Sequence, residues 1–118
     1  MDKNGIGILA ENAAASYLQN QGFHILERNY RSRFGEIDII AEDKGELVFV
    51  EVRSREGTRF GLPQETVNWA KQQKIRNMAA RYLKEKGLWQ KNCRFDVIGV
   101  LIDENQKIKS LELIRDAF

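Results

Sequence analysis

The stretch GEIDIIAEDKGELVFVEVR, residues 35–53, decides the fold of this 118-residue chain. Its two apolar parts, residues 36–41 and 47–53, predict strands, and Lys44-Gly45 between them predicts a two-residue hairpin turn. With that turn Asp43 faces Glu46, and counting along the ladder places Asp38 opposite Glu51. Opposed residues of an antiparallel pair point to one face, with Cβ atoms about 4.5–5.5 Å apart. The register therefore predicts two carboxylates side by side near the middle of a sheet.

Two neighbouring carboxylates between apolar strands need compensation, because leaving both charged is unfavourable or forces one to protonate. Mg²⁺ favours one or two carboxylates together with water and phosphate oxygens. Arg53 follows Glu51 by two residues and so lies on the same strand face. The three side chains predict a site for a metal, a phosphodiester and an attacking water. The simpler alternative is a half-solvated strand face on which Glu51 and Arg53 pair with neighbours.

The rest of the chain extends this hairpin into a layered domain. A helix is predicted over residues 6–20, with strands over 23–30, 93–102 and 107–114. Residues 54–62 are predicted to form a loop, after which a helix begins at Pro63, runs to residue 86 and ends at Gly87. The order α-β-β-β-α-β-β is typical of an α/β fold with a mixed sheet of about five strands flanked by two helices. With no linker or repeat, we expect one domain over residues 1–118.

Composition excludes several classes of site. The chain has 42% hydrophobic and 31% charged residues, and no apolar run is long enough to span a membrane. The first residues lack the apolar core of a signal peptide, so we expect a cytoplasmic protein. A single cysteine, Cys93, and a single histidine, His24, exclude a disulfide within the chain, a cysteine zinc cage and a histidine metal cluster. The net charge is only +2, but arginines concentrate in residues 28–33 and 53–59.

Several single residues have a structural interpretation beside a functional one. His24 is predicted to be an ordinary strand residue and Cys93 a small buried one. Asp96 is predicted to be structural, pairing with Arg94 or with a neighbouring strand. Trp69 and Trp89 are predicted to pack in the core or at a subunit contact, with stacking on bases as the alternative. Glu36, on the same face as Asp38, and Gln64, at a helix start, are further candidate site residues. Glu11 and Lys74 are candidates too, and their alternatives are a helix-surface acid or salt-bridge partner for Glu11 and a solvated helix face for Lys74.

The pieces Gly35-Glu36-Ile37-Asp38 and Phe49-Val50-Glu51-Val52-Arg53, in this order and spacing, resemble the YraN-like family of small bacterial proteins. The segment Arg28-Asn29-Tyr30-Arg31 is similar to that family as well, and the likeness covers nearly the whole chain. The family is assigned to the restriction-endonuclease-like PD-(D/E)xK superfamily and is similar to archaeal Holliday-junction resolvases. The resemblance therefore implies an αβββαβ core and a metal-dependent nuclease that hydrolyses phosphodiester bonds.

By the resemblance, Asp38 and Glu51 would be ligands of Mg²⁺ or Mn²⁺, with the Val52 carbonyl as a third ligand. Glu11 matches the acid of the first helix in resolvase-like proteins, and Arg53 occupies the position of the motif lysine. Arginine stays protonated and cannot act as a general base, although it can hold a phosphate. The amine of the motif lysine could instead come from the second helix, where Lys71 and Lys74 are the candidates.

Nucleic acid, with DNA favoured, is the expected partner, and no membrane partner is expected. The basic residues predicted to hold its backbone are Arg31, Arg33, Arg55, Arg59 and Lys71. A loop that orders on nucleic acid is expected at the second arginine cluster. A homodimer is suggested by analogy with junction resolvases. The alternative function is a non-catalytic nucleic-acid-binding or interaction domain that keeps the nuclease scaffold, and the arginine in the lysine position favours it.

Overall fold

The computed structural model describes residues 3–56 and 63–118. The elements follow the predicted order, with one short extra helix, and they are α1 (Lys3–Asn20), β1 (His24–Ser32), β2 (Gly35–Asp43), β3 (Glu46–Glu56), η1 (Pro63–Thr66), α2 (Trp69–Lys86), β4 (Cys93–Ile102) and β5 (Ile108–Ile114). The predicted α/β class with two flanking helices and five strands is confirmed.

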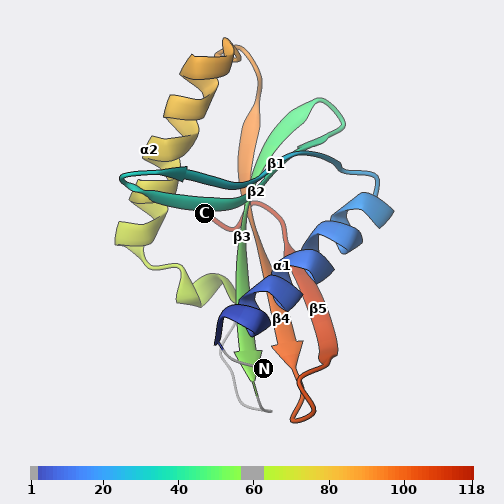
Figure 1. Cartoon of the computed structure of the whole chain (residues 1–118). Helices are drawn as coiled ribbons and strands as arrows, with labels where there is room; N and C mark the ends of the chain where they lie inside the picture. Colours follow the sequence, from blue (N-terminus) through green and yellow to red (C-terminus); the bar gives the residue numbers. More distant parts are fainter. Residues whose placement is uncertain (1–2, 57–62) are drawn as a thin grey trace.

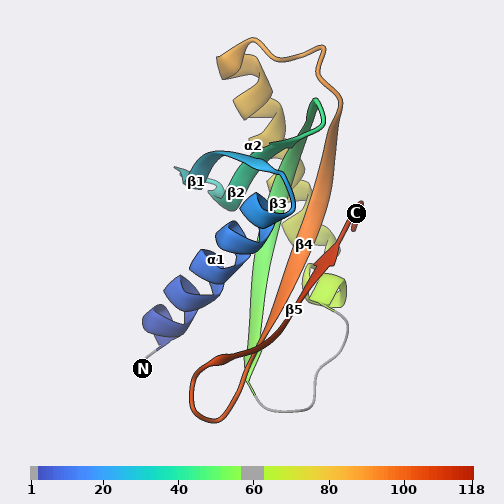
Figure 2. The same cartoon turned by 90° about the vertical axis from the view of Figure 1, so that its right-hand side faces the viewer.

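The five strands form one sheet in the order β1-β2-β3-β4-β5. Only β3 and β4 run parallel, and the chain between them contains α2, which is the crossover that the sequence predicts. Helix α1 crosses one face of the sheet and α2 covers the other, as the two views show (Figures 1 and 2).

Strand β3 is covered on both faces. Val48 and Val50 belong to the core under α1, whereas Leu47 and Phe49 belong to the core under α2. All four side chains are at most 1% exposed. The continuous apolar run that begins β3 therefore reflects a central strand, as predicted.

The β2–β3 turn has the predicted form. Lys44 and Gly45 have φ values of 51° and 86°, the pair of positive angles that a type I′ hairpin turn requires. The ladder runs from Asp43 opposite Glu46 to Ile39 opposite Val50, which confirms the predicted register.

The ladder between β2 and β3 stops one pair short of Asp38 and Glu51. Beyond that point β2 pairs only with β1, while β3 continues beside β4 as far as Glu56. In Figure 1 the free end of the β1–β2 hairpin turns across the direction of β3. Ile39 packs in the core under α1 but Ile37, two residues away, packs under α2, so the strand alternation breaks at Asp38. The two strands thus separate at the predicted acidic pair.

The prediction of one continuous helix from Pro63 to residue 86 is wrong. Pro63–Thr66 is a separate 3₁₀ turn, and α2 begins only after Asn68, whose extended backbone (φ −72°, ψ 173°) interrupts the helix. The Asn68 side chain caps α2 by accepting a 2.9 Å hydrogen bond from the Lys71 amide. The Thr66 carbonyl accepts a hydrogen bond from Arg53. At the other end Gly87, at φ 66°, closes α2 as predicted.

The short helix η1 lies directly on strand β4. A Cβ built at Gly99 would overlap the ring of Pro63, so no side chain fits between them. The glycine is therefore required by the close approach of η1 to the sheet.

Other boundaries and environments differ from the predictions in detail. Strand β3 continues through residues 54–56, which were predicted to be loop, and residues 57–62 of that predicted loop lie outside the described residues. Cys93 is exposed because it opens β4 at the sheet end, and Trp69 and Trp89 are 73% and 60% exposed, so neither packs in the core. Within the described ranges no helix is long and apolar enough to cross a membrane.

Candidate metal centre

Asp38 meets Glu51 where β2 and β3 separate. Val52, next to Glu51, donates its backbone N–H to Asp38 Oδ2 at 2.8 Å, a contact from the side chain of β2 to the backbone of β3. Burial, a hydrogen bond shared with the Glu51 carboxyl and repulsion from that carboxyl raise the pKa of Asp38 from 3.8 to about 9. The predicted meeting of these two acids thus occurs, although the backbone ladder has already ended.

Glu51 is buried without a full complement of partners. Its side chain is 5% exposed, and Lys71 Nζ lies 3.3 Å from its Oε2 atom. Among the described residues this oxygen has no hydrogen-bond donor, so the contact with Lys71 is electrostatic only. A buried carboxylate oxygen that lacks a donor is costly and leaves a free coordination position.

Two further acids complete a cluster with Asp38. One carboxylate oxygen from each of Glu11 on α1, Glu36 on β2 and Asp38 lies within 4.8 Å of the other two. Asn29 Nδ2 donates to Glu11 Oε1 at 2.8 Å and to Glu36 Oε1 at 2.6 Å. We call Glu11, Glu36, Asp38 and Glu51 the acidic fork.

Asn29 is the residue of this site that the sequence interpretation missed. It adopts φ 54° inside β1, a left-handed conformation that asparagine tolerates better than most residues. An asparagine in the middle of a strand is unfavourable, and this was the signal available in the sequence.

The acidic fork fits a hard divalent cation by donor type and spacing. Its four carboxylates are countered, among the described contacts, by Lys71 at Glu51 and by Arg31, whose Nε lies 3.4 Å from Glu36 Oε2. The Arg31 side chain is 74% exposed, so that second pair is screened by water. In six-coordinate Mg²⁺ each ligand atom lies about 2.1 Å from the ion. The oxygens of Glu11, Glu36 and Asp38 all lie within 4.8 Å of one another, close enough for one ion to draw ligands from all three residues.

Arg53 makes its contacts away from the carboxylates. Its Nε donates to Thr66 Oγ1 and its Nη2 to the Thr66 carbonyl, both at 2.8 Å. Thr66 in turn donates to the Pro63 carbonyl at 2.7 Å. The expectation that Arg53 points at the acidic pair is therefore wrong for this structure, because the guanidinium is used to hold η1 on β3.

The remaining predicted site residues are distributed over different surfaces. Lys71 is at the acidic fork, whereas Lys74 lines a groove on the exposed side of α2. Arg33 lies over the Phe34 ring at 5.0 Å, and Arg55 is exposed near the end of β3. Gln64 has a buried Oε1 without a hydrogen-bond partner among the described residues. Val52 uses its N–H on Asp38, and a role for its carbonyl stays a prediction, while Arg59 lies outside the described residues.

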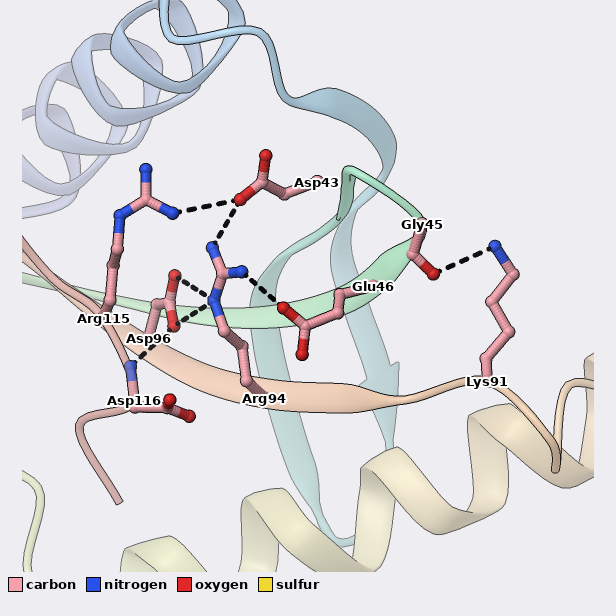
Figure 3. A network of polar contacts seen from close by, with 8 residues as sticks. All are labelled: Asp43, Gly45, Glu46, Lys91, Arg94, Asp96, Arg115 and Asp116. Atoms are coloured by element: carbon pink, nitrogen blue, oxygen red, sulfur yellow. Dashed lines mark hydrogen bonds and ion pairs between the residues drawn. The ribbon is translucent and has the colours of Figure 1, made fainter.

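A second group of acids lies at the other end of the same ladder, and there every acid is paired. Arg94 donates to Asp43 and Glu46 at 2.9 Å and to both oxygens of Asp96 at 3.1 and 3.2 Å (Figure 3). Arg115 adds a 3.0 Å hydrogen bond to Asp43, and the Asp116 amide adds one of 3.1 Å to Asp96. We call Asp43, Glu46, Arg94, Asp96 and Arg115 the arginine network. The predicted structural pairing of Asp96 with Arg94 is confirmed.

In the arginine network the pKa of Asp43 is lowered, whereas that of Asp38 is raised. Burial alone would raise the pKa of Asp43, but hydrogen bonds from Arg94 and Arg115 outweigh it and hold the pKa below its usual value. Burial likewise opposes the charge of Arg94, and its carboxylate partners overcome this and raise its pKa. These charges stabilise one another, so the network needs no ligand.

The architecture defines the class of protein. A five-stranded mixed sheet with one helix on each face, and with acids at the separation of its second and third strands, is consistent with a restriction-endonuclease-like core. The profile of Uncharacterised protein family UPF0102 matches residues 10–100. The chain belongs to this family, which confirms the resemblance to YraN-like proteins.

The relatives match the chain over almost its full length. It is 45% identical to a UPF0102 protein of Moorella thermoacetica over 118 residues, which are 100% of this chain and 98% of the relative. It is 51% identical to UPF0102 proteins of Desulforapulum autotrophicum, over 98% of this chain and 94% of the relative, and of Syntrophus aciditrophicus, over 95% and 87%.

Proposed function

We propose that the protein is a Mg²⁺- or Mn²⁺-dependent nuclease whose site is the acidic fork. The observation that carries the proposal is the buried Glu51 oxygen without a hydrogen-bond donor, beside an Asp38 carboxyl whose pKa is raised to about 9. Such a pair, which the partly exposed Lys71 compensates only in part, gains stability from a bound divalent cation. DNA, including branched DNA, is the substrate that the family resemblance favours.

The residues divide the work by their positions. Asp38 and Glu51 would hold the ion, and Glu11 and Glu36, whose carboxylates gather with that of Asp38, would be further oxygen donors. When bound, such an ion supplies positive charge to a phosphate and acidifies water. Lys71, 3.3 Å from Glu51 and 38% exposed, would present an ammonium group to a phosphodiester at the opening of the site.

Asn29 would keep two of these acids in place. By donating to both Glu11 and Glu36 it fixes their orientation without adding charge. The amide occupies one oxygen of each carboxylate, and the second oxygen of Glu36 lies near the exposed Arg31 side chain. The arrangement supports a preorganised site rather than a random collection of surface acids.

A second candidate function is a non-catalytic nucleic-acid-binding domain on the same scaffold. The observation that favours it concerns Arg53, which occupies the position of the motif lysine. Its guanidinium donates hydrogen bonds to Thr66. No basic group on β3 itself then reaches the acids through the described contacts.

Cleavage assays with isosteric variants test the proposal. Branched, duplex and single-stranded DNA and RNA are incubated with Mn²⁺ or Mg²⁺ and wild type, Asp38→Asn or Glu51→Gln. The matched control is Glu104→Gln, an exposed acid in the β4–β5 turn. We expect metal-dependent cleavage by wild type and the control, and a loss of about 100-fold or more in the two site variants. Metal-independent cleavage, or equal rates in all four proteins, would contradict the proposal, and salt-dependent binding without cleavage would favour the second candidate.

A further inference from the structure

A groove on the exposed side of α2 is lined by basic and aromatic side chains and takes no part in the acidic fork. Its volume is about 370 Å³, and its lining includes Phe34, Lys74, Arg81, Lys84 and Trp89. Phe34 comes from the β1–β2 turn, whereas Trp89 follows the C-terminal end of α2. The groove is thus bounded by an aromatic side chain from each of two separate segments, with cations between them.

The side chains of the groove carry charge of one sign only. Lys74, Arg81 and Lys84 are cationic, and no Asp or Glu is among the residues that line it. Arg81 lies over the Phe34 ring at 5.1 Å and Arg33 lies over the same ring at 5.0 Å, so this aromatic surface is embedded in positive charge. The complement of such a surface is an anion that also offers flat apolar faces.

The aromatic rings are accessible. Phe34 is 48% exposed and Trp89 is 60% exposed, although both are large apolar side chains that folding would bury if a position were available. Their exposure beside cations matches sites for single-stranded nucleic acid, where aromatic side chains stack on bases and basic side chains follow the backbone.

Helix α2 links the groove to the acidic fork. Lys74 lies one helical turn after Lys71, which contacts Glu51. From Lys74 to Lys84 the helix advances about 15 Å, at about 1.5 Å per residue. A strand that lies in the groove would therefore come within about one helical turn of Lys71, the cation that contacts Glu51.

We infer that this groove binds a single-stranded segment of nucleic acid, with bases stacked on Trp89 and Phe34 and phosphates held by Lys74, Arg81 and Lys84. The inference rests on the proposed function, because it names the part of the substrate that flanks the acidic fork. Single-stranded or splayed nucleic acid is favoured over intact duplex because only unpaired bases expose their faces to protein rings.

Tryptophan fluorescence in EDTA tests the inference without any cleavage. The chain has two tryptophans, so Trp69→Phe leaves Trp89 as the only reporter. The probe is an oligothymidylate of roughly a dozen nucleotides, within the usual range of single-strand sites. We expect quenching of Trp89 at low salt, a weaker effect of blunt duplex of the same length, and no quenching in the matched protein Trp89→Phe, which reports Trp69.

Affinity measured by anisotropy of a labelled oligothymidylate gives a second readout. Trp89→Ala is expected to weaken binding about tenfold, whereas Trp69→Ala changes it less than about twofold. The double variant Lys74→Gln/Lys84→Gln should lower the slope of log affinity against log salt by about 1.4, that is about 0.7 for each lost phosphate contact. Lys107→Gln/Lys109→Gln, which removes the same charge near the start of β5, is the control and should leave the slope unchanged.

Each alternative occupant has a defined result that overturns the inference. Poly-glutamate that quenches Trp89 and competes with the oligonucleotide would show a site for acidic protein segments. A Trp89 signal that changes with protein concentration alone would show a contact between two copies of the chain. Oligonucleotide binding that is unchanged in Trp89→Ala and in Lys74→Gln/Lys84→Gln would place the single strand elsewhere.

The two proposals fail in different ways. Metal-dependent cleavage that Asp38→Asn abolishes, together with no effect of the groove variants on binding, would leave the proposed function standing and overturn the groove. Trp89-dependent binding of oligothymidylate in EDTA, without cleavage under any metal, would support the groove and contradict the nuclease.

Discussion

The same two strands carry acidic residues at both ends of their ladder, and the two ends are built differently. At the turn end, Asp43 and Glu46 are held by Arg94, which also binds Asp96, and the whole arginine network is hydrogen-bonded. At the open end, Asp38 and Glu51 share a hydrogen bond with each other, and one Glu51 oxygen has no donor in the described part of the chain. The acids of the turn end accept hydrogen bonds from arginines, whereas Lys71 lies near Glu51 without donating to it, and this difference in hydrogen-bonded compensation separates a structural cluster from a candidate binding site.

The difference follows from the strands that neighbour each end. Where β2 and β3 are paired, β4 lies beside β3 and delivers Arg94 and Asp96 to the acids of the turn. Where β2 leaves β3, α1 supplies another acid, Glu11, and β1 supplies the uncharged Asn29. The fold thus supplies hydrogen-bonded arginines at the turn end, whereas at the open end the described cation nearest the buried acids is the partly exposed Lys71, which does not donate to the Glu51 oxygen beside it.

The largest effect is expected from breaking the compensated end. Arg94→Met leaves Asp96, which is 0% exposed, and Asp43 without their main cation. Removing one partner of a buried ion pair costs about 3–5 kcal/mol, so the free energy of unfolding should fall by that amount in urea denaturation at pH 7. A loss below about 1 kcal/mol would show that the network is not a structural element.

Metal binding should distinguish the two ends next. At a concentration of 100 times its dissociation constant, a ligand that binds only the folded state adds about 2.7 kcal/mol. We expect Mn²⁺ to raise the melting temperature of wild type and of Arg115→Met, which alters only the arginine network, but not of Asp38→Asn. A rise of equal size in Asp38→Asn would move the metal away from the acidic fork.

The pH dependence of stability should follow Asp38. Its folded pKa is raised from 3.8 to about 9, so the folded state holds a proton that the unfolded state has released. The resulting stability is complete below about pH 4 and is lost as the pH rises to about 9. Without metal, the free energy of unfolding of wild type should therefore fall more steeply across this window than that of Asp38→Asn. Urea denaturation of both proteins at about pH 5, 7 and 9 measures the difference. Parallel curves for the two proteins would contradict the assigned coupling.

The smallest effect is expected at the exposed edge of the acidic fork. Arg31→Gln removes an ion pair with Glu36 in which the arginine is 74% exposed. Such pairs contribute about 0–1 kcal/mol, so the free energy of unfolding should change within that range. A loss of several times this size would mean that Arg31 is a true counter-ion and that the fork is better compensated than its contacts indicate.

The sequence predicted the paired end of the ladder better than the open end. Lys44-Gly45 specifies a type I′ turn, and a turn of fixed length determines every pairing up to Ile39 with Val50. The break at Asp38 was not predictable in this way, because strand alternation assumes a continuous ladder. Asn29 and its positive φ belong to the same break, and only its low strand propensity signalled it.

Contacts between distant segments were the other limit. Strand periodicity shows that Arg53 and Glu51 share a face, but it contains no information on η1, whose Thr66 takes up the guanidinium. Likewise the short spacing of Arg94 and Asp96 in one strand made their pairing one of the two expected for Asp96, whereas Arg115, 72 residues after Asp43, joins the network only through the fold. Trp69 and Trp89 were predicted to pack in the core or at a subunit contact, and their exposure excludes only the first of these.

The contact between Gly99 and Pro63 determines the distance between η1 and the sheet. Because residue 99 has only a hydrogen atom as its side chain, the Pro63 ring packs on the backbone of β4. Val67, four residues after Pro63, is only 2% exposed. Any larger side chain at position 99 would push η1 away from the sheet, together with the first turn of α2. That turn carries Lys71, which contacts Glu51. Gly99 therefore influences the distance between Lys71 and Glu51, although both residues are far from it in the sequence.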